Sequence, residues 1–132
     1  MSPRIPIIVL YSLFGILYLV AGASFVAVDS GYLPTDLRRL VLMIVHGDKT
    51  TMHIAQEFGT HMIILGIVTL WFARNYERSG WFHLAMTIGW GLFALIHWDD
   101  VRNYASYKWG PVLNTAPFVL FAATGLWRRR IA

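Results

Sequence analysis

Cysteine is absent from this 132-residue sequence, and charged residues are few. Without cysteine the chain can form no disulfide bond, offer no thiolate ligand to a metal and carry out no thiol redox chemistry. Charged residues account for only 14% of the positions, whereas hydrophobic residues account for 57%. A soluble domain of this length could not bury so many apolar side chains. The composition therefore predicts an integral membrane protein, which we expect to form a single domain over residues 1–132.

Four long apolar stretches occupy most of the chain. They cover residues 5–28, 52–73, 81–101 and 111–127. At a rise of about 1.5 Å per residue, helices of these lengths suit a hydrocarbon core of about 30 Å. Each stretch is therefore predicted to be a membrane-spanning helix, and the second and third are separated by a tight turn at residues 75–80.

A shorter apolar segment lies between the first two spans. It covers residues 36–46, begins after Pro34 and ends before Gly47, which are typical helix start and stop signals. This segment is too short to cross a membrane, so we expect it to lie at the interface with Arg38 and Arg39 snorkelling. The predicted fold is all-α: an up-down four-helix membrane bundle with one short interfacial helix between spans 1 and 2.

The orientation of the predicted bundle depends on its basic residues. Four spans place both termini on one side, and the arginines at 74 and 128–130 follow the second and fourth spans closely, which favours termini in the cytoplasm. The net charge is +4, but its main concentration, residues 128–130, is interpreted as an anchor at the membrane surface. We therefore expect no nucleic-acid partner.

Ionisable side chains inside the predicted spans are the strongest indication of function, because charge within a membrane is expensive to hold. His53, Glu57 and His61 are spaced four residues apart, so they lie along one face of a helix. If the second and third spans form an antiparallel hairpin, Glu57 comes to the depth of His97. The hairpin would then gather four ionisable side chains: His53, Glu57, His97 and Asp100.

Such a group suits acid–base chemistry, because a carboxylate and an imidazole held together can take up a proton and return it. We predict Glu57 as the principal acid or base, His53 or His97 as its partner, and Asp100 as the group that orients a histidine. The substrate would be a small hydrophobic molecule that enters from the bilayer and is isomerised, cyclised or ring-opened. Four further residues are predicted to position this substrate: His61, Trp90, Tyr104 and Asn114.

The same side chains leave metal and haem sites as alternatives. His53, Glu57, His61 and His97 are ligand types suited to Zn, Mn or non-haem Fe. The stripe from His53 to His61 is roughly 12 Å long, so two of its members completed by His97 would bind an ion more easily than all three. Haem needs histidines that face each other, whereas His97 faces Glu57. No metal or cofactor is part of the predicted site, and a metal or haem bound by these residues stays an alternative.

Other interpretations of the polar groups remain open. Histidine and glutamate can pair across helices only to fix the packing of a small bundle. The runner-up function is an accessory subunit of a larger respiratory or photosynthetic membrane complex, in which histidines bind a pigment, haem or metal or merely pack. A transporter is a third possibility and would need an oligomer, because four spans make a narrow pathway. The expected partners are the bilayer and a small hydrophobic ligand, with a homo-oligomer or a larger complex left open.

Residues outside this group receive structural interpretations. His46 and His83 are interpreted as interfacial histidines, and most tryptophans as anchors at the membrane interface, with the mid-span Trp90 as the exception. Pro117 is expected to kink the fourth span. The glycines within the spans are predicted to let helices approach closely: Gly15, Gly22, Gly59, Gly66, Gly89, Gly91 and Gly125.

Two local patterns are similar to known families. The run Glu57-Phe58-Gly59-Thr60-His61, followed by an apolar stretch that ends at Ala73-Arg74, resembles the second helix of small bacterial four-helix membrane proteins of the DoxX-like type. The first span, with Gly15 and Gly22, is similar to their first helix. This resemblance implies a four-helix bundle in a bacterial inner membrane.

The pattern His53-x-x-x-Glu57 on a second span also resembles the histidine and glutamate of sterol isomerases of the emopamil-binding type. In those enzymes the two residues are thought to move a proton on a lipophilic substrate. The resemblance implies the same roles for His53 and Glu57.

Overall fold

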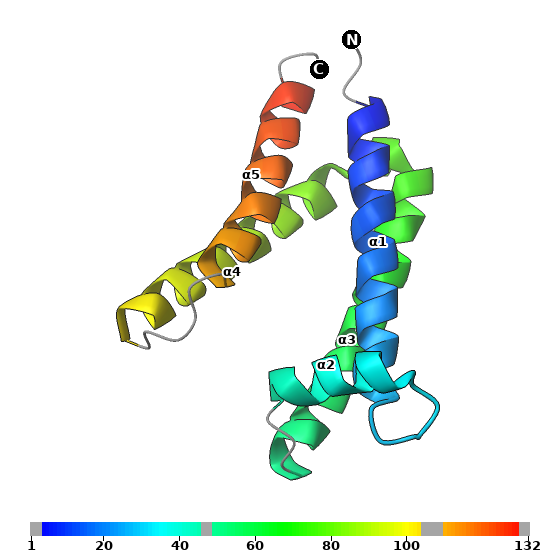
Figure 1. The fold of residues 1–132 in the computed structure, drawn as a ribbon. Coiled ribbons are helices and arrows are strands. Elements are labelled where there is room, and N and C mark those ends of the chain that lie inside the picture. Colours follow the sequence, from blue (N-terminus) through cyan, green and yellow to red (C-terminus); the bar gives the residue numbers. More distant parts are fainter. Residues whose placement is uncertain (1–3, 46–48, 104–109, 130–132) are drawn as a thin grey trace. The chain divides into compact units, whose positions relative to one another are not determined.

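Helices joined by turns make up the computed structural model, which describes residues 4–45, 49–103 and 110–129 (Figure 1). Five α-helices and one short 3₁₀ helix occur in these ranges, without any strand. In chain order they are α1 (Arg4–Val26), α2 (Thr35–Val45), α3 (Lys49–Arg74), η1 (Tyr76–Arg78), α4 (Gly80–Asn103) and α5 (Gly110–Arg129). The all-α class is therefore confirmed over the described residues.

Each apolar segment of the sequence lies in a helix. The four predicted spans fall largely or wholly within α1, α3, α4 and α5, the predicted turn at 75–80 contains η1, and the predicted helix at 36–46 is α2. Within the described residues, two helical segments are long and apolar enough to cross a membrane, Arg4–Val26 and Met52–Arg74. Two candidate spans are weaker evidence than four, and the four-helix membrane bundle stays a prediction.

The chain divides into two compact units. Residues 9–74 form one, here called the α1–α3 unit. Residues 1–8 and 75–132 form the other, here called the α4–α5 unit, which also contains η1 and the first turns of α1. The prediction of a single domain is not tested by this division.

Glycine-to-glycine contacts join the two long helices of the α1–α3 unit. A Cβ atom added to Gly22 would lie 2.6 Å from the carbonyl oxygen of Gly59, and one added to Gly66 would lie 2.9 Å from the carbonyl oxygen of Gly15. Gly15 and Gly22 are seven residues apart on α1, as are Gly59 and Gly66 on α3. The earlier glycine of α1 contacts the later glycine of α3. The backbones of α1 and α3 therefore touch at two levels in an antiparallel arrangement, as predicted for these four glycines.

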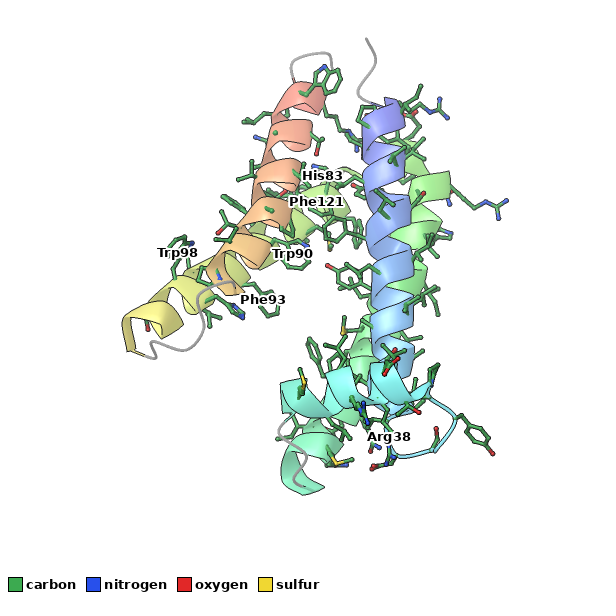
Figure 2. All side chains as sticks on the ribbon, in the orientation of Figure 1. Arg38, His83, Trp90, Phe93, Trp98 and Phe121 are labelled. Atoms are coloured by element: carbon green, nitrogen blue, oxygen red, sulfur yellow. The ribbon has the colours of Figure 1, made fainter. Side chains whose placement is uncertain are left out.

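A side-chain hydrogen bond of Arg38 ties the beginning of α2 to the segment that follows α1. The backbone N–H of Arg38 donates to the carbonyl of Pro34 at 2.9 Å, and Nε of Arg38 donates to the carbonyl of Val28 at 3.2 Å (Figure 2). Val28 and Val41 are buried. Gly31 lies between the helices with a positive φ of 73°, a conformation that glycine adopts without strain. Arg38 thus anchors α2 within the chain as well as bearing charge.

Helices α4 and α5 pack against each other in the α4–α5 unit. Phe121 of α5 is fully buried, and a Cβ atom added to Gly91 of α4 would lie 3.2 Å from the ring of Phe118. Further along, Nε1 of Trp98 donates a hydrogen bond to Oγ1 of Thr115 at 3.0 Å. Residue numbers rise along α4 as they fall along α5, so the pair is antiparallel.

The prediction for the remaining glycine of α4 is wrong within this unit. A Cβ atom added to Gly89 would meet no atom within 4 Å. Gly89 therefore makes no close helix contact in the α4–α5 unit, although it lies only two residues from Gly91.

Candidate functional site

Two of the predicted site residues contact each other on α3. Nε2 of His53 lies 3.3 Å from Oε1 of Glu57, one helical turn away. The two side chains are 72% and 64% exposed, so they lie on the surface of the α1–α3 unit. Ile54 and Phe58, each one residue further along, are also exposed. The pair therefore shares its surface with apolar side chains.

His61 continues the same stripe without reaching the carboxylate of Glu57. Its Nδ1 lies 2.8 Å from the carbonyl oxygen of Glu57. A carbonyl only accepts, so Nδ1 must carry the proton, and in the neutral ring Nε2 is then the acceptor. The prediction that His53, Glu57 and His61 share one face of a helix is confirmed.

The predicted partners of this stripe belong to the other unit. His97 lies on α4, where its Nδ1 donates to the carbonyl of Phe93 at 2.8 Å. Trp90 is half-buried on the same helix, with its ring centroid 6.0 Å from that of Phe93. Asp100 lies on α4 near Trp98, but its side chain is outside the described ones.

The other two predicted substrate contacts fall outside the described side chains. Asn114 lies on α5, but its side chain is outside the described ones, and Tyr104 is outside the described residues altogether. A contact of His53 and Glu57 with His97 would link the two units, and it stays a prediction. Among the described residues, no three of His, Asp and Glu are grouped so that they could hold a metal ion.

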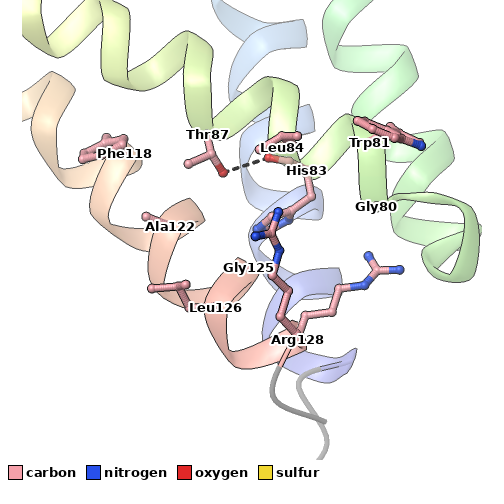
Figure 3. A pocket seen from close by; sticks show the side chains of 11 residues that line it. Gly80, Trp81, His83, Leu84, Thr87, Phe118, Ala122, Gly125, Leu126 and Arg128 are labelled. Atoms are coloured by element: carbon pink, nitrogen blue, oxygen red, sulfur yellow. Dashed lines mark hydrogen bonds between the residues drawn. The ribbon is translucent and has the colours of Figure 1, made fainter. Parts of the chain in front are cut away.

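A pocket of about 590 Å³ lies between α4 and α5 (Figure 3). Its apolar wall comes from leucine, phenylalanine and alanine side chains of both helices, and two guanidinium groups lie at its rim. The lining residues are Gly80, Trp81, His83, Leu84, Thr87, Phe118, Ala122, Gly125, Leu126, Arg128 and Arg129. The sequence alone did not indicate this pocket.

His83 forms part of the pocket wall and is only 4% exposed. Its Nε2 donates a hydrogen bond of 2.8 Å to the carbonyl of Phe121 on the facing helix (Figure 2). Oγ1 of Thr124 lies 3.4 Å from the same nitrogen. The interpretation of His83 as an interfacial histidine did not include this contact, in which the imidazole joins α4 to α5.

Gly125 makes this contact possible. A Cβ atom there would lie 3.0 Å from Cδ2 and 3.1 Å from Nε2 of His83. The missing side chain therefore gives the imidazole access to the Phe121 carbonyl one turn earlier. Gly125 was predicted to allow a close approach, but the sequence did not indicate that a histidine would occupy the space.

Arg128 connects the end of α5 to the turn that precedes α4. Its Nη1 donates to Oγ of Ser79 at 2.7 Å, and its Nη2 donates to the carbonyls of Tyr76 and Glu77 at 3.3 and 3.4 Å. The guanidinium also lies 4.5 Å from the centroid of the Tyr76 ring, a cation–π distance. The interpretation of Arg128 only as a membrane-surface anchor is therefore incomplete.

The charge of Arg128 is not neutralised within the described residues. All three of its hydrogen-bond partners are uncharged oxygens. The nearby carboxylate of Glu77 instead lies 4.0 Å from Nη1 of Arg4. Arg129 also lines the pocket and is exposed. The pocket thus combines an apolar wall with a positively charged rim.

Comparisons with known proteins found no matching family model, no matching curated protein and no matching solved structure. The resemblances to DoxX-like proteins and to emopamil-binding isomerases therefore rest on their local motifs alone.

Proposed function

We propose that this chain is a small membrane enzyme that uses Glu57 and His53 to move a proton on a lipophilic molecule. The observation that carries the proposal is the 3.3 Å contact between Oε1 of Glu57 and Nε2 of His53. Both residues lie in Met52–Arg74, a candidate membrane span. Polar groups within a span are costly to keep and by default indicate function.

The surroundings of the pair suit an apolar substrate. Ile54 and Phe58 are exposed beside the two polar side chains, so a hydrophobic molecule on this face would contact both kinds of group. In the proposed four-helix bundle, α4 would cover the face and add His97. The bundle would lie in a bacterial inner membrane, with α2 at the interface and both termini in the cytoplasm.

An isomerisation can be written with these two residues alone. The Glu57 carboxylate removes a proton from one carbon of the substrate, and the imidazolium of His53 delivers a proton to another atom of it. The electron pair of the broken C–H bond shifts within the substrate to the atom that is protonated. The proton on Glu57 then returns to Nε2 of His53 across the 3.3 Å contact, so no proton is gained or lost overall.

Deuterium incorporation tests the proposal on a mixture of candidate substrates. The purified protein is incubated in D₂O with a bacterial lipid extract, and mass spectrometry identifies species that gain carbon-bound deuterium. We expect the wild type to label a lipophilic species, and Glu57→Gln and His53→Gln to lose the labelling. Glu77→Gln is the matched control, because Glu77 is exposed on η1 outside the candidate spans. Labelling that is equal in the wild type and Glu57→Gln would refute the proposal.

A second candidate is an accessory subunit of a larger membrane complex. Exposed apolar side chains follow α4 at helical spacing, as at Ile88, Leu92 and Leu95, and α1 carries a similar stripe. Such stripes suit partner helices as well as lipid. Native mass spectrometry of the protein extracted in mild detergent distinguishes the two candidates. Stoichiometric larger subunits would favour the accessory role, and the chain alone would favour the enzyme.

A further inference from the structure

We infer that the pocket between α4 and α5 binds an anionic phospholipid. The volume of about 590 Å³ lies within the usual range of ligand pockets. One wall is apolar, with Leu84, Phe118 and Leu126 among its side chains, and the rim carries Arg128 and Arg129. This separation of apolar and cationic surface matches an amphiphile with an acyl chain and a negatively charged head.

Hydrogen bonds position the guanidinium of Arg128 at the rim, where a negatively charged lipid headgroup would lie. Its bonds to Ser79, Tyr76 and Glu77 use three of the five N–H donors of an arginine. Ser79 is itself fully buried and donates to the Tyr76 carbonyl at 2.6 Å. The positive charge is therefore held against the buried Ser79 and the Tyr76 carbonyl, while no carboxylate among the described residues pairs with it. An anion at the rim would supply the missing charge.

The position of the rim favours a membrane lipid as the source of the anion. Trp81 lines the same pocket and is 85% exposed, and exposed tryptophans at helix ends are typical of headgroup depth. Arg128 and Arg129 lie in the last turn of α5. Basic pockets between helices at the cytoplasmic side of a membrane are suited to phosphate-containing headgroups.

His83 and Gly125 set the width of this pocket. The hydrogen bond from His83 to the Phe121 carbonyl joins the two helices at 2.8 Å, and Gly125 leaves room for the ring. His83 is thus a positioning residue for the lipid site. The inference does not depend on Glu57 or His53, because both lie in the other unit.

The test measures binding of phosphatidylglycerol and of phosphatidylcholine with identical acyl chains to the intact protein in mild detergent, by native mass spectrometry. Palmitate and inorganic phosphate serve as separate probes. We expect one phosphatidylglycerol to bind more tightly than phosphatidylcholine, and neither the fatty acid nor phosphate alone to reproduce it. Equal affinity for the two phospholipids, or binding of palmitate or phosphate as tight as that of phosphatidylglycerol, would overturn the inference.

Two pairs of variants locate the lipid. Ala122→Phe fills the apolar wall, whereas Ala123→Phe makes the same change at an exposed neighbour that does not line the pocket. Arg129→Gln removes a positive charge from the pocket rim, and the side chain of Arg129 makes no hydrogen bond among the described residues. Arg74→Gln is its control, because it removes an exposed charge in the other unit.

The phosphatidylglycerol affinity should fall about fivefold in Arg129→Gln, the usual effect of one basic residue at an anionic surface. It should be lost in Ala122→Phe and unchanged in Ala123→Phe and Arg74→Gln. If Ala122→Phe fails to fold, the arginine pair decides. Wild-type affinity in Arg129→Gln, or equal losses within either pair, would overturn the inference.

Discussion

Replacing Gly22 by alanine perturbs the contact that holds α1 against α3. The new methyl group would lie 2.6 Å from the carbonyl oxygen of Gly59 and 2.9 Å from the backbone nitrogen of Ile63. Both are backbone atoms, so rotation of a side chain cannot relieve the clash and the helices must separate. Overpacking of this kind costs about 1–3 kcal/mol of unfolding free energy.

Gly89→Ala is the matched control for this substitution. It makes the same change inside a helix, but the added Cβ atom meets nothing within 4 Å. Both variants gain helix propensity of about 1 kcal/mol, so the difference between them isolates the clash. We expect Gly89→Ala to be more stable than the wild type, and Gly22→Ala to be about 1–3 kcal/mol less stable than Gly89→Ala.

Circular dichroism during titration of the detergent-solubilised protein with sodium dodecyl sulfate measures both unfolding free energies. The reasoning requires the two variants to differ in the stated direction. Equal stability of Gly22→Ala and Gly89→Ala would refute it, because the close approach of α1 and α3 could then not be limited by their backbones.

Two further predictions concern the α4–α5 unit. His83→Leu removes the hydrogen bond to the Phe121 carbonyl and should lower the unfolding free energy in the same titration by about 1 kcal/mol; stability at or above that of the wild type would contradict this. Arg128→Gln removes the bonds to Ser79 and Tyr76 and should speed backbone amide exchange across η1, measured by hydrogen–deuterium exchange, whereas Arg129→Gln should not. Equal exchange in both arginine variants would exclude a clamping role for Arg128.

The helices of this protein could be predicted from the sequence because each depends on local signals. Long apolar stretches indicated α1 and α3, and Pro34 and Gly47 bounded the segment that forms α2. The stripe of His53 and Glu57 follows from helical spacing alone. The close approach of a helix at Gly22 could be predicted because a small residue allows it on either side, and the residue on the facing helix is Gly59.

The α4–α5 pocket could not be predicted because it depends on contacts between distant parts of the chain. His83 is buried only because Gly125, on another helix, leaves space for its ring. Arg128 likewise bonds to Ser79, which lies 49 positions earlier. Neither histidine nor arginine carries a sequence signal for such a partner, so the position of each near a span end favoured an interfacial interpretation.

The most direct test of the proposed site is whether Glu57 and His97 meet in the membrane. The absence of native cysteine makes disulfide cross-linking specific, and a disulfide needs Cα atoms within about 7 Å. The double variant Glu57→Cys with His97→Cys is oxidised mildly in native membranes and its mobility is compared on a denaturing gel. Glu57→Cys with Thr87→Cys is the control, since Thr87 lies roughly 15 Å from His97 along α4.

A hairpin of α3 and α4 that gathers the proposed proton-transfer site predicts an intramolecular disulfide in the first double variant and none in the control. Absence of that disulfide, or an equal yield in the control, would contradict the hairpin and the place of His97 in the proposed site.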